Sequence, residues 1–238
     1  GRFYTSNAAA VELHVSLDVL TGVPLEVAVS PDTDSERAHQ PEAETLTGCL
    51  FMADRGYFDK TRLCAIDQHR GAFIVRAPVS INPRIVEAYD AEGTPLPALL
   101  GRKLKTVRYA LWGAGPVDLT VEWQDGRKAP IRMRLIMTYN PRHFGFQYLA
   151  TNLDRSRYDT LAIREAYRLR WQVELLFKEW KSYANLHAFN TGKRAIAEGL
   201  IWASLTAAAL NRYMAHATQR ITTLEISTQR AALSAVHF

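Results

Sequence analysis

The fold is decided by the stretch Cys49-Leu50-Phe51-Met52-Ala53-Asp54-Arg55-Gly56-Tyr57. Its first five residues form a short apolar run, and a carboxylate follows at once. A buried strand that ends in a carboxylate is typical of an α/β sheet, in which functional groups gather at strand ends. The following residues support this interpretation, because 59–69 has the pattern of a helix and 71–77 that of another buried strand. The stretch therefore predicts an α/β fold with Asp54 at the end of a strand.

Upstream of this stretch, the sequence predicts a hairpin. Residues 11–20 alternate strictly, with apolar side chains on one face and Glu12, His14, Ser16 and Asp18 on the other. Such alternation indicates a half-buried strand. Thr21-Gly22 has the composition of a turn, and residues 25–29 continue as the partner strand. Residues 41–46 begin like a helix, with a proline and two glutamates in the first turn.

Downstream, the pattern changes twice. Short β-rich pieces separated by Gly and Pro fill residues 80–152, and they lie at 84–89, 104–112, 117–123, 131–139 and 144–149. They predict an all-β insertion into the α/β core. Helical patterns follow at about residues 156–184 and 192–218. The predicted domains are therefore 1–79, the first part of the core, 80–152, the β-rich insertion, and 153–238, the helical second part of the core.

Composition excludes several classes of protein. No run approaches the roughly 18 apolar residues of a membrane helix, and no basic-then-apolar leader opens the chain. Cys49 and Cys64 match no metal or redox spacing. We therefore expect a cytoplasmic protein with reduced thiols and no membrane partner.

Charge is divided unevenly along the chain. Residues 1–100 carry 8 Lys+Arg against 14 Asp+Glu, whereas residues 101–238 carry 21 against 10. A basic half of this kind favours a polyanionic partner, and nucleic acid is the first candidate.

Residues 167–181 contain the chemistry-bearing helix. At about 100° per residue, Tyr167, Arg170, Glu174 and Lys181 project from one face about 60° wide. The apolar stripe of the same helix consists of Leu169, Val173, Leu176, Phe177, Trp180 and Ala184. The polar row has a simpler interpretation as a solvated face on which Arg170 pairs with Glu174.

Asp54 is the natural partner for this row. Carboxylates that converge from a strand end and a helix can hold a pair of Mg²⁺ ions for displacement at phosphorus. Arg170 and Lys181 would then bind flanking phosphates. The alternative role for Asp54 is that of a helix N-cap or turn residue before Gly56.

The spacing Tyr167, two residues, Arg170, three residues, Glu174, six residues, Lys181 resembles the signature of DDE transposases of the insertion-sequence-four type. Asp54-Arg55-Gly56-Tyr57 resembles the segment around that family's second catalytic Asp. The 119 residues between Asp54 and Glu174 suit a core interrupted by a β insertion, as in that family.

The resemblance implies a ribonuclease-H-like mixed sheet flanked by helices, in which three carboxylates bind two Mg²⁺ ions, with Mn²⁺ as a substitute. It implies nicking of double-stranded DNA at transposon ends, strand transfer to a target, and a homodimer in the complex that joins two ends. Asp54 and Glu174 would be the catalytic metal ligands. Tyr167, Arg170 and Lys181 would contact DNA.

The family's insertion often supplies an aromatic residue that stacks on a flipped base. Trp112, Trp123 and Phe146 are the candidates here, and the sequence does not choose between them. Single aromatic residues in β pieces are more often part of the core.

The chain departs from the family pattern in its first catalytic Asp, which lies on the first strand of the sheet in that family. No acidic residue precedes Glu12, and Asp18 stands beside the hairpin turn. We therefore expect a fragment that begins after the first Asp and is inactive by itself, and the sequence leaves open whether its full-length parent is active. Three alternatives stay open: a DNA-binding remnant without catalysis, a metal-dependent nuclease without strand transfer, and an α/β protein unrelated to nucleic acid.

Overall fold

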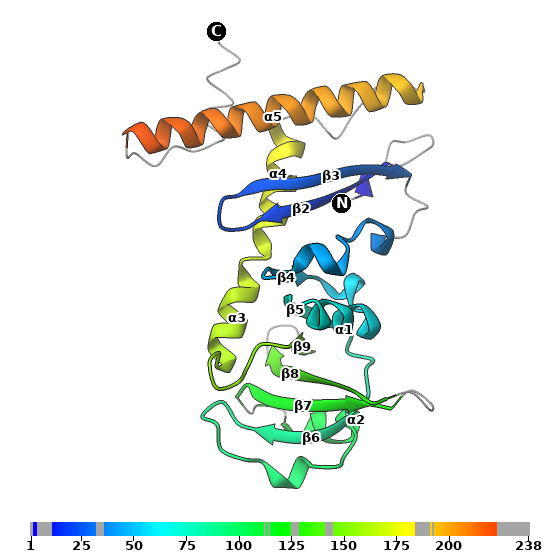
Figure 1. Ribbon diagram of the computed structural model, residues 1–238, viewed down its shortest axis with the longest axis vertical. Helices are drawn as coiled ribbons and strands as arrows, with labels where there is room; N and C mark the ends of the chain where they lie inside the picture. Colours follow the sequence, from blue (N-terminus) through cyan, green and yellow to red (C-terminus); the bar gives the residue numbers. More distant parts are fainter. Residues whose placement is uncertain are drawn as a thin grey trace. The chain divides into compact units, whose positions relative to one another are not determined.

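The computed structural model describes residues 2–3, 11–31, 36–111, 113, 115–124, 129–140, 145–183, 191 and 193–222. The chain divides into two compact units. One unit is Ser35–Arg170, and the other combines Gly1–Asp34 with Trp171–Phe238. Figure 1 labels the helices and strands of both.

The unit Ser35–Arg170 contains a six-stranded sheet in the order β4-β5-β9-β8-β7-β6, counted over its described residues. Its strands are β4 (Leu50–Ala53), β5 (Ala72–Ala77), β6 (Arg84–Tyr89), β7 (Val117–Trp123), β8 (Ile131–Asn140) and β9 (Gly145–Thr151). β4 and β5 are parallel, and the other neighbours are antiparallel. The predicted mixed α/β class is therefore confirmed.

Helix α1 (Lys60–Gln68) connects the parallel strands β4 and β5. Asp59 begins it, because its carboxylate accepts hydrogen bonds from the backbone N–H groups of Thr61 and Arg62 at 2.8 and 3.1 Å. The helix buries Leu63 and Ile66 against the sheet. This is the helix predicted over 59–69, and it fixes where the chain returns to begin β5.

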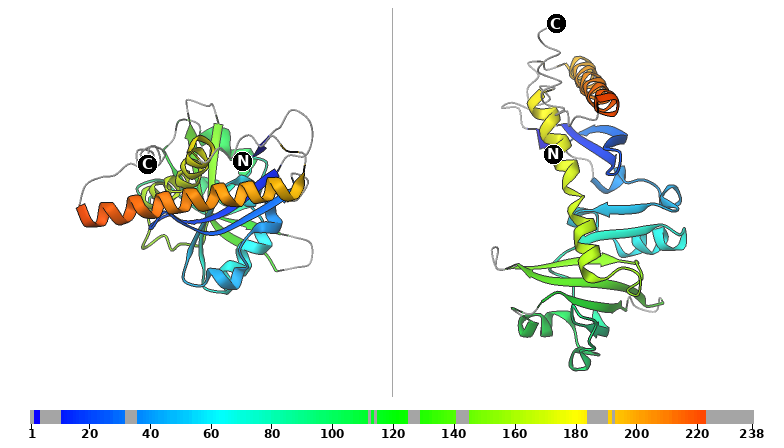
Figure 2. Two further views of the ribbon diagram at one scale, coloured as in Figure 1. Left: turned by 90° about the horizontal axis from the view of Figure 1, so that it is seen from above. Right: turned by 90° about the vertical axis from the view of Figure 1, so that its left-hand side faces the viewer.

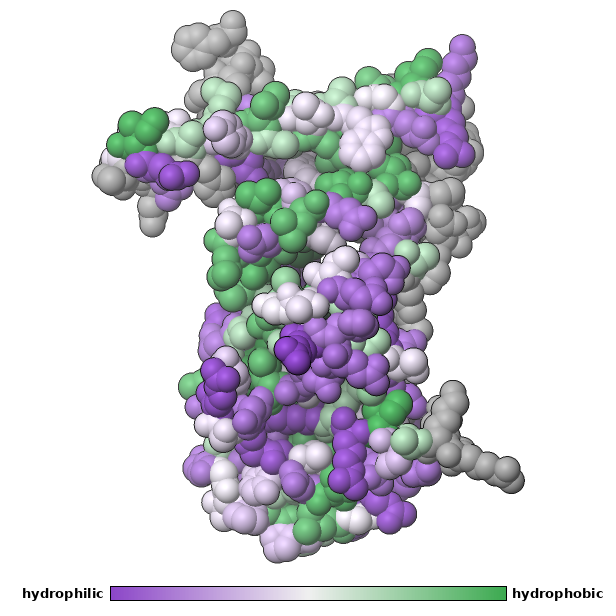
Figure 3. Space-filling view, in the orientation of Figure 1, coloured by the Kyte–Doolittle hydropathy of each residue, from purple (hydrophilic) through white to green (hydrophobic). Residues whose placement is uncertain are grey.

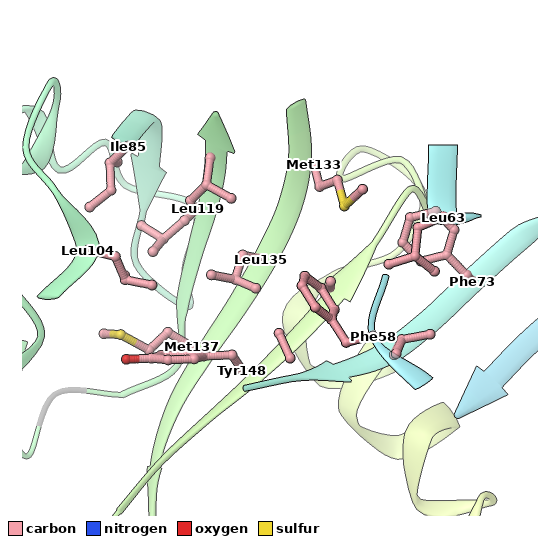
Figure 4. Close-up of a cluster of buried hydrophobic side chains, with 14 of the residues drawn as sticks. Phe58, Leu63, Phe73, Ile85, Leu104, Leu119, Met133, Leu135, Met137 and Tyr148 are labelled. Carbon is pink, nitrogen blue, oxygen red and sulfur yellow. The ribbon is translucent and has the colours of Figure 1, made fainter. Parts of the chain in front are cut away.

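Polar residues dominate much of the face of this unit that Figure 3 shows. Figure 4 shows the main apolar cluster, in which Phe73, Leu119, Leu135 and Tyr148 are essentially buried. Strands β6–β9 supply much of this cluster and hydrogen-bond into the same sheet as β4 and β5. That residues 80–152 are an insertion into another core stays a prediction, as do the predicted domain boundaries.

Two predicted elements of this unit were wrong. The piece at 104–112 is helical over α2 (Leu104–Val107) and the 3₁₀ turn η5 (Arg108–Leu111). Leu104, Val107 and Leu111 are three and four residues apart, so a helix turns all three toward the core. This helical period outweighs the β propensity of the segment. Residues 41–46 form no α-helix either. They contain a 3₁₀ turn, η2 (Ala43–Leu46). The other 3₁₀ turns are η1 (Glu36–His39), η3 (Arg55–Tyr57) and η4 (Pro97–Leu99).

The predicted hairpin is confirmed in the other unit. β2 (Val11–Asp18) pairs antiparallel with β3 (Val23–Pro31), and the short β1 (Arg2–Phe3) pairs with β2. Asp18 closes the turn by accepting hydrogen bonds from the Leu20 N–H and the Thr21 hydroxyl. Glu12 and His14, which lie on the polar face of the alternating strand, are both buried, and His14 is hydrogen-bonded to Ser30 at 2.8 Å.

The helical stretch predicted at 156–184 is two helices, α3 (Thr160–Arg168) and α4 (Trp171–Tyr183). α3 ends in a tightened turn, in which Leu169 N donates to Ala166 O and Arg170 N to Tyr167 O. The helices bury their apolar residues in different cores, Ile163 and Tyr167 in one unit, Leu176 and Trp180 in the other. Leu169, predicted to be buried, is 39% exposed, and Ala184 lies outside the described residues.

The long helix α5 (Arg194–Thr222) contains the helix predicted over 192–218. Figure 2 shows it from two further directions. It packs with α4 and the hairpin around Leu13, Trp180, Ile201 and Leu205. None of the helices in the described part of the chain combines the length and apolar character that a membrane span requires.

Candidate active site at the end of strand β4

Asp54 is the first residue after β4, as the sequence predicted. It stands at the N-cap position of η3, but its side chain makes no capping hydrogen bond. Its Oδ1 is buried, and no hydrogen-bond donor reaches it from the described residues. A buried carboxylate oxygen without a hydrogen bond is costly. The side chain of Asp54 therefore does not cap the turn, although its carbonyl oxygen accepts a hydrogen bond from Tyr57 N at 3.0 Å as a turn residue would, and its buried Oδ1 suits an oxygen that accepts a ligand.

Arg76 is the charged neighbour of Asp54, and sequence reasoning missed it. It lies on β5, and its Nη1 is 3.8 Å from Asp54 Oδ1. The side chains of Arg76 and Asp54 are 43% and 49% exposed as a whole, although the Oδ1 atom of Asp54 is itself buried. The available signal was a lone arginine inside the otherwise apolar strand Ala72–Ala77, which runs beside β4.

Tyr167, the first residue of the signature, contacts the end of β4 that precedes Asp54. Its side chain is 8% exposed, and its hydroxyl donates a hydrogen bond to Ala53 O at 3.3 Å. Burial raises the pKa of Tyr167 to about 12, and the nearby Asp54 carboxylate adds to the rise, while Arg170 and Arg76 oppose it. The phenol thus keeps its proton and can donate at any physiological pH.

Arg170 completes the signature residues of this unit. Its guanidinium carbon lies 5.7 Å from the centroid of the Tyr167 ring, within the range of a cation–π contact. Tyr167 is in the last turn of α3, whereas Arg170 lies beyond its end. The prediction that all four signature residues share a face of one continuous helix was therefore wrong.

Glu174 and Lys181 lie on α4 in the other unit, and both are partly buried. They are two turns apart and project from the same side of the helix. Glu174 is in the first turn and Lys181 in the last, which suits the helix dipole. The proposed DNA contacts of Tyr167, Arg170 and Lys181 stay predictions.

The side chains that could ligate a metal ion are spread over the described part of the chain. No group of three or more His, Cys, Asp or Glu residues within the described ranges could hold a metal ion. The buried Oδ1 of Asp54 nevertheless fits one ligand of a divalent cation, which prefers carboxylate oxygens. Asp54 and Glu174 as a joint metal site stay a prediction.

The aromatic candidates differ in their surroundings. Trp123 packs against the core beside Phe58, at 6.3 Å between ring centroids. Phe146 also packs on the core and stacks with Tyr148 at 6.5 Å. Trp112 lies outside the described residues. An exposed aromatic residue that the sequence reading overlooked is Tyr109, whose ring contacts the Arg108 guanidinium at 4.7 Å.

A hollow in this unit is lined by charged side chains that form ion pairs. It has a volume of about 360 Å³ and is lined by Arg132, Arg134 and Arg155 among other residues. Each of these arginines pairs with a carboxylate. Arg132 pairs with Glu122, Arg134 with Asp118, and Arg155 with both Glu87 and Asp118. The basic character of the pocket is therefore neutralised within the unit.

Comparison with known proteins points to one family. The profile described as "Transposase DDE domain" matches residues 5–211. The transposase for insertion sequence element IS421 of Escherichia coli is 39% identical over 66 residues, which cover 28% of this chain and 18% of that protein. The probable transposase for insertion sequence element IS5377 of Geobacillus stearothermophilus is 25% identical over 236 residues, covering 94% of this chain and 54% of that protein.

The chain thus spans between about a fifth and about half of the length of these relatives. The profile match runs from before β2 to within α5 and includes Asp54 and all four signature positions. The chain belongs to the transposase DDE domain family.

Proposed function

We propose that this chain is the catalytic part of a transposase that cuts double-stranded DNA at the ends of an insertion sequence and joins them to a target. Asp54 and Glu174 are its catalytic carboxylates and bind Mg²⁺, for which Mn²⁺ can substitute. The observation that carries the proposal is Asp54, a carboxylate at a strand end with a buried oxygen that lacks a hydrogen bond.

The proposed fold is ribonuclease-H-like, with residues 80–152 as an insertion. β4 supports it as an edge strand among the described strands of its sheet, since an edge offers free N–H and C=O groups to a further strand. We propose that the strand with the first catalytic Asp pairs there and that this Asp is the third ligand.

When bound, divalent cations would polarise the scissile phosphate and lower the pKa of the attacking water. Asp54 and Glu174 would supply the negative oxygens that hold them. If Asp54 bound a metal ion, Arg76 would lose its ion-pair partner. Its guanidinium, which offers several donors, would then bind a phosphate oxygen. Tyr167 acts as a positioning residue, since it holds the main chain at Ala53.

DNA binding rests on the family match and on the basic second half of the chain. Arg170 and Lys181 are the proposed phosphate contacts, and two copies would act together on a pair of ends. The third ligand matters for the test, because two carboxylates hold two metal ions poorly.

The test is a nicking assay on a transposon-end duplex with Mg²⁺ or Mn²⁺. It compares this chain, the longest protein that its gene encodes, and that protein carrying Glu174→Gln. We expect the long form to nick and the variant to lose at least about 1,000-fold in rate, as for removal of a catalytic group. DNA binding without nicking in the long form would favour a remnant, and nicking without joined products a nuclease. Absence of DNA binding at low salt would overturn the proposal.

A further inference from the structure

The basic side chains of the unit Ser35–Arg170 fall into two groups. The arginines that line the hollow each pair with a carboxylate. The second group, here called the basic ridge, lies on the edge strand β6 and on the segment that runs beside it. Its members are Arg84, Arg102, Lys103 and Lys105. All four residues are exposed, and in the described part of the chain none of them forms an ion pair.

The sequence around the ridge supplies no negative charge to neutralise it. Residues 93–117 contain four basic residues and no Asp or Glu. Asp118, the next acidic residue along the chain, is held by Arg134 and Arg155. The ridge is therefore a local source of positive potential, and such potentials attract anionic partners.

Arg84 and Lys103 stand directly opposite each other in this ridge. They form an antiparallel bridge, in which the flanking residues make the hydrogen bonds, at 3.0 and 2.9 Å. In a pair of this kind the side chains come closest, with Cα atoms about 4.5 Å apart. Like charges in directly opposite positions destabilise a sheet. The fold thus holds two positive charges together at a cost in stability, which suits a site for an anion.

Glu122 offsets only part of this charge. It lies opposite Arg84 on β7, but its carboxylate accepts a hydrogen bond of 2.7 Å from Nε of Arg132 on β8. The order across the strands is Lys103, Arg84, Glu122 and Arg132. This row carries three positive charges and one negative charge, and the surplus lies at the edge of the sheet.

The backbone beneath the ridge is held in place. Leu104 and Val107 of α2 are fully buried in the main core. The backbone N–H of Lys105 donates a hydrogen bond to Asn82 Oδ1 at 2.9 Å. Because this frame is fixed, the basic residues keep their spacing without a ligand, which lowers the entropy cost of binding one.

We propose that the basic ridge binds the phosphate backbone of duplex DNA, whatever its sequence. Arg and Lys side chains are common phosphate ligands, and each phosphate that they neutralise releases counterions. A protein partner would meet an apolar centre, whereas the apolar residues of α2 beside the ridge are buried. The inference rests on the proposed function, from which it takes DNA as the polyanion, but it assigns a contact that the signature residues do not provide.

The ridge lies away from the proposed cleavage site. β6 and β4 are the two edges of the described six-stranded sheet (Figure 1). Five strand spacings of about 4.8 Å separate them, on the order of 24 Å. This distance corresponds to about seven base pairs of duplex at about 3.4 Å each. The ridge would therefore hold the duplex beyond the cut and would add affinity without contact to the reacting atoms.

The salt dependence of DNA binding tests the inference. The variant combines Arg84→Gln with Lys103→Gln in the whole chain, and fluorescence anisotropy measures its binding to a duplex of about 30 base pairs from about 50 to about 200 mM salt. Each phosphate contact contributes about 0.9 to the slope of log K against log salt, so the slope should fall by about 1.8. Affinity at about 0.1 M salt should fall between about 10-fold and 100-fold.

Arg168→Gln combined with Arg194→Gln is the matched control. It removes the same net charge, but from two exposed arginines that are paired with Glu165 and Glu198. Its slope should change by less than about 0.5.

Thermal unfolding without DNA guards against a folding defect. Because Arg84 and Lys103 repel each other, the ridge variant should unfold at the wild-type midpoint or above it. A midpoint clearly below that of the wild-type chain would overturn the argument from repulsion.

A transposon-end duplex and an unrelated duplex should give the same loss in the ridge variant, because phosphate contacts carry no sequence information. A loss confined to the transposon end would overturn the inference. A ridge variant with the wild-type slope and affinity would overturn it too, and would leave the proposed function standing. Failure of the wild-type chain to bind either duplex at low salt would overturn both.

Discussion

The Tyr167 hydroxyl donates a hydrogen bond to the carbonyl oxygen of Ala53, 3.3 Å away. This contact joins the last turn of α3 to the residue that precedes Asp54, across 114 positions of sequence. It lies within one unit and is buried, so water does not compete for it. The signature tyrosine therefore contributes to the position of Asp54, whatever else it contacts.

The raised pKa of the Tyr167 phenol should make the free energy of unfolding depend on pH above pH 10. An unfolded tyrosine loses its proton near pH 10, whereas the pKa of Tyr167 in the folded unit is about 12. Between these values the unfolded state is deprotonated first, so the free energy of unfolding falls as pH rises from 10 to 12. The contribution is fully present below pH 10, and its loss is about 2–3 kcal/mol.

Tyr167→Phe is the variant that checks this expectation. It should lose about 1 kcal/mol at pH 7, where it lacks the bond to Ala53, and it should show a smaller loss between pH 10 and 12. Urea unfolding gives both quantities, the loss of unfolding free energy at pH 7 and its fall between pH 10 and 12. Amide exchange in β5 and β9 at pH 7 assigns the loss to the unit that contains Tyr167. Equal slopes in the two proteins over that range would contradict the assigned role of the phenol.

Asp54 and Asp59 form a matched pair for a stability test. Both precede a helical turn, but Asp59 caps two backbone N–H groups, whereas Asp54 caps none. Asp59→Ala should cost about 1 kcal/mol, and Asp54→Ala should cost nothing or stabilise the metal-free chain. Thermal unfolding in the presence of a chelator measures both. If Asp54→Ala lowers stability as much as Asp59→Ala does, the side chain of Asp54 stabilises the fold.

The buried ion network around Asp118 should be essential for folding. Asp118 is 4% exposed by its side chain and pairs with both Arg134 and Arg155. Asp118→Leu leaves Arg134, itself 6% exposed, without its carboxylate, which should cost about 3–5 kcal/mol. Glu122→Leu, on the same strand and paired with the exposed Arg132, should cost at most about 1 kcal/mol.

The double variant Asp118→Leu/Arg134→Met separates the network from simple packing. Because it removes both charges, it should be more stable than Asp118→Leu alone in urea unfolding. If the losses of unfolding free energy in Asp118→Leu and Arg134→Met add up to the loss in the double variant, the two side chains act independently.

Gly71 is a position at which any side chain should disturb the unit. A Cβ there would lie 2.8 Å from the carbonyl oxygen of Leu46 and 2.7 Å from Cγ2 of the buried Ile66. Gly71→Ala should therefore cost about 1–3 kcal/mol. Gly115→Ala, with open space around its Cβ, is the control and should change stability by less than about 0.5 kcal/mol. Equal unfolding midpoints for the two variants would be the contrary result.

Local patterns predicted most strands and the position of Asp54 at a strand end. The strand Leu50–Ala53, the strands β7 and β8, and the hairpin β2–β3 follow from apolar runs, alternation and turn residues. The break between α3 and α4 could not be predicted in this way. No Gly or Pro marks it, and it arises because Tyr167 and Trp180 are buried in different cores.

The candidate site was predictable only in part, for a similar reason. Asp54 follows directly from its strand, but its neighbour Arg76 depends on the pairing of β4 with β5, which a reading of single segments does not reveal. The burial of Glu12 and His14 likewise depends on what covers the second face of the hairpin.

The joint binding of a metal by Asp54 and Glu174 is tested most directly by iron-mediated cleavage of the protein. Fe²⁺ occupies oxygen-rich sites of this kind, and radicals formed at the bound ion cut the nearby backbone. The long form of the protein would be treated with Fe²⁺ and ascorbate, alone and with excess Mg²⁺, beside Asp54→Asn, Glu174→Gln and the control Asp59→Asn. We predict cuts beside both residues 54 and 174 that Mg²⁺ suppresses, that Asp59→Asn retains, and that either of the other variants abolishes at both positions. Cuts at neither position, or cuts at one that survive the change at the other, would contradict a shared metal site.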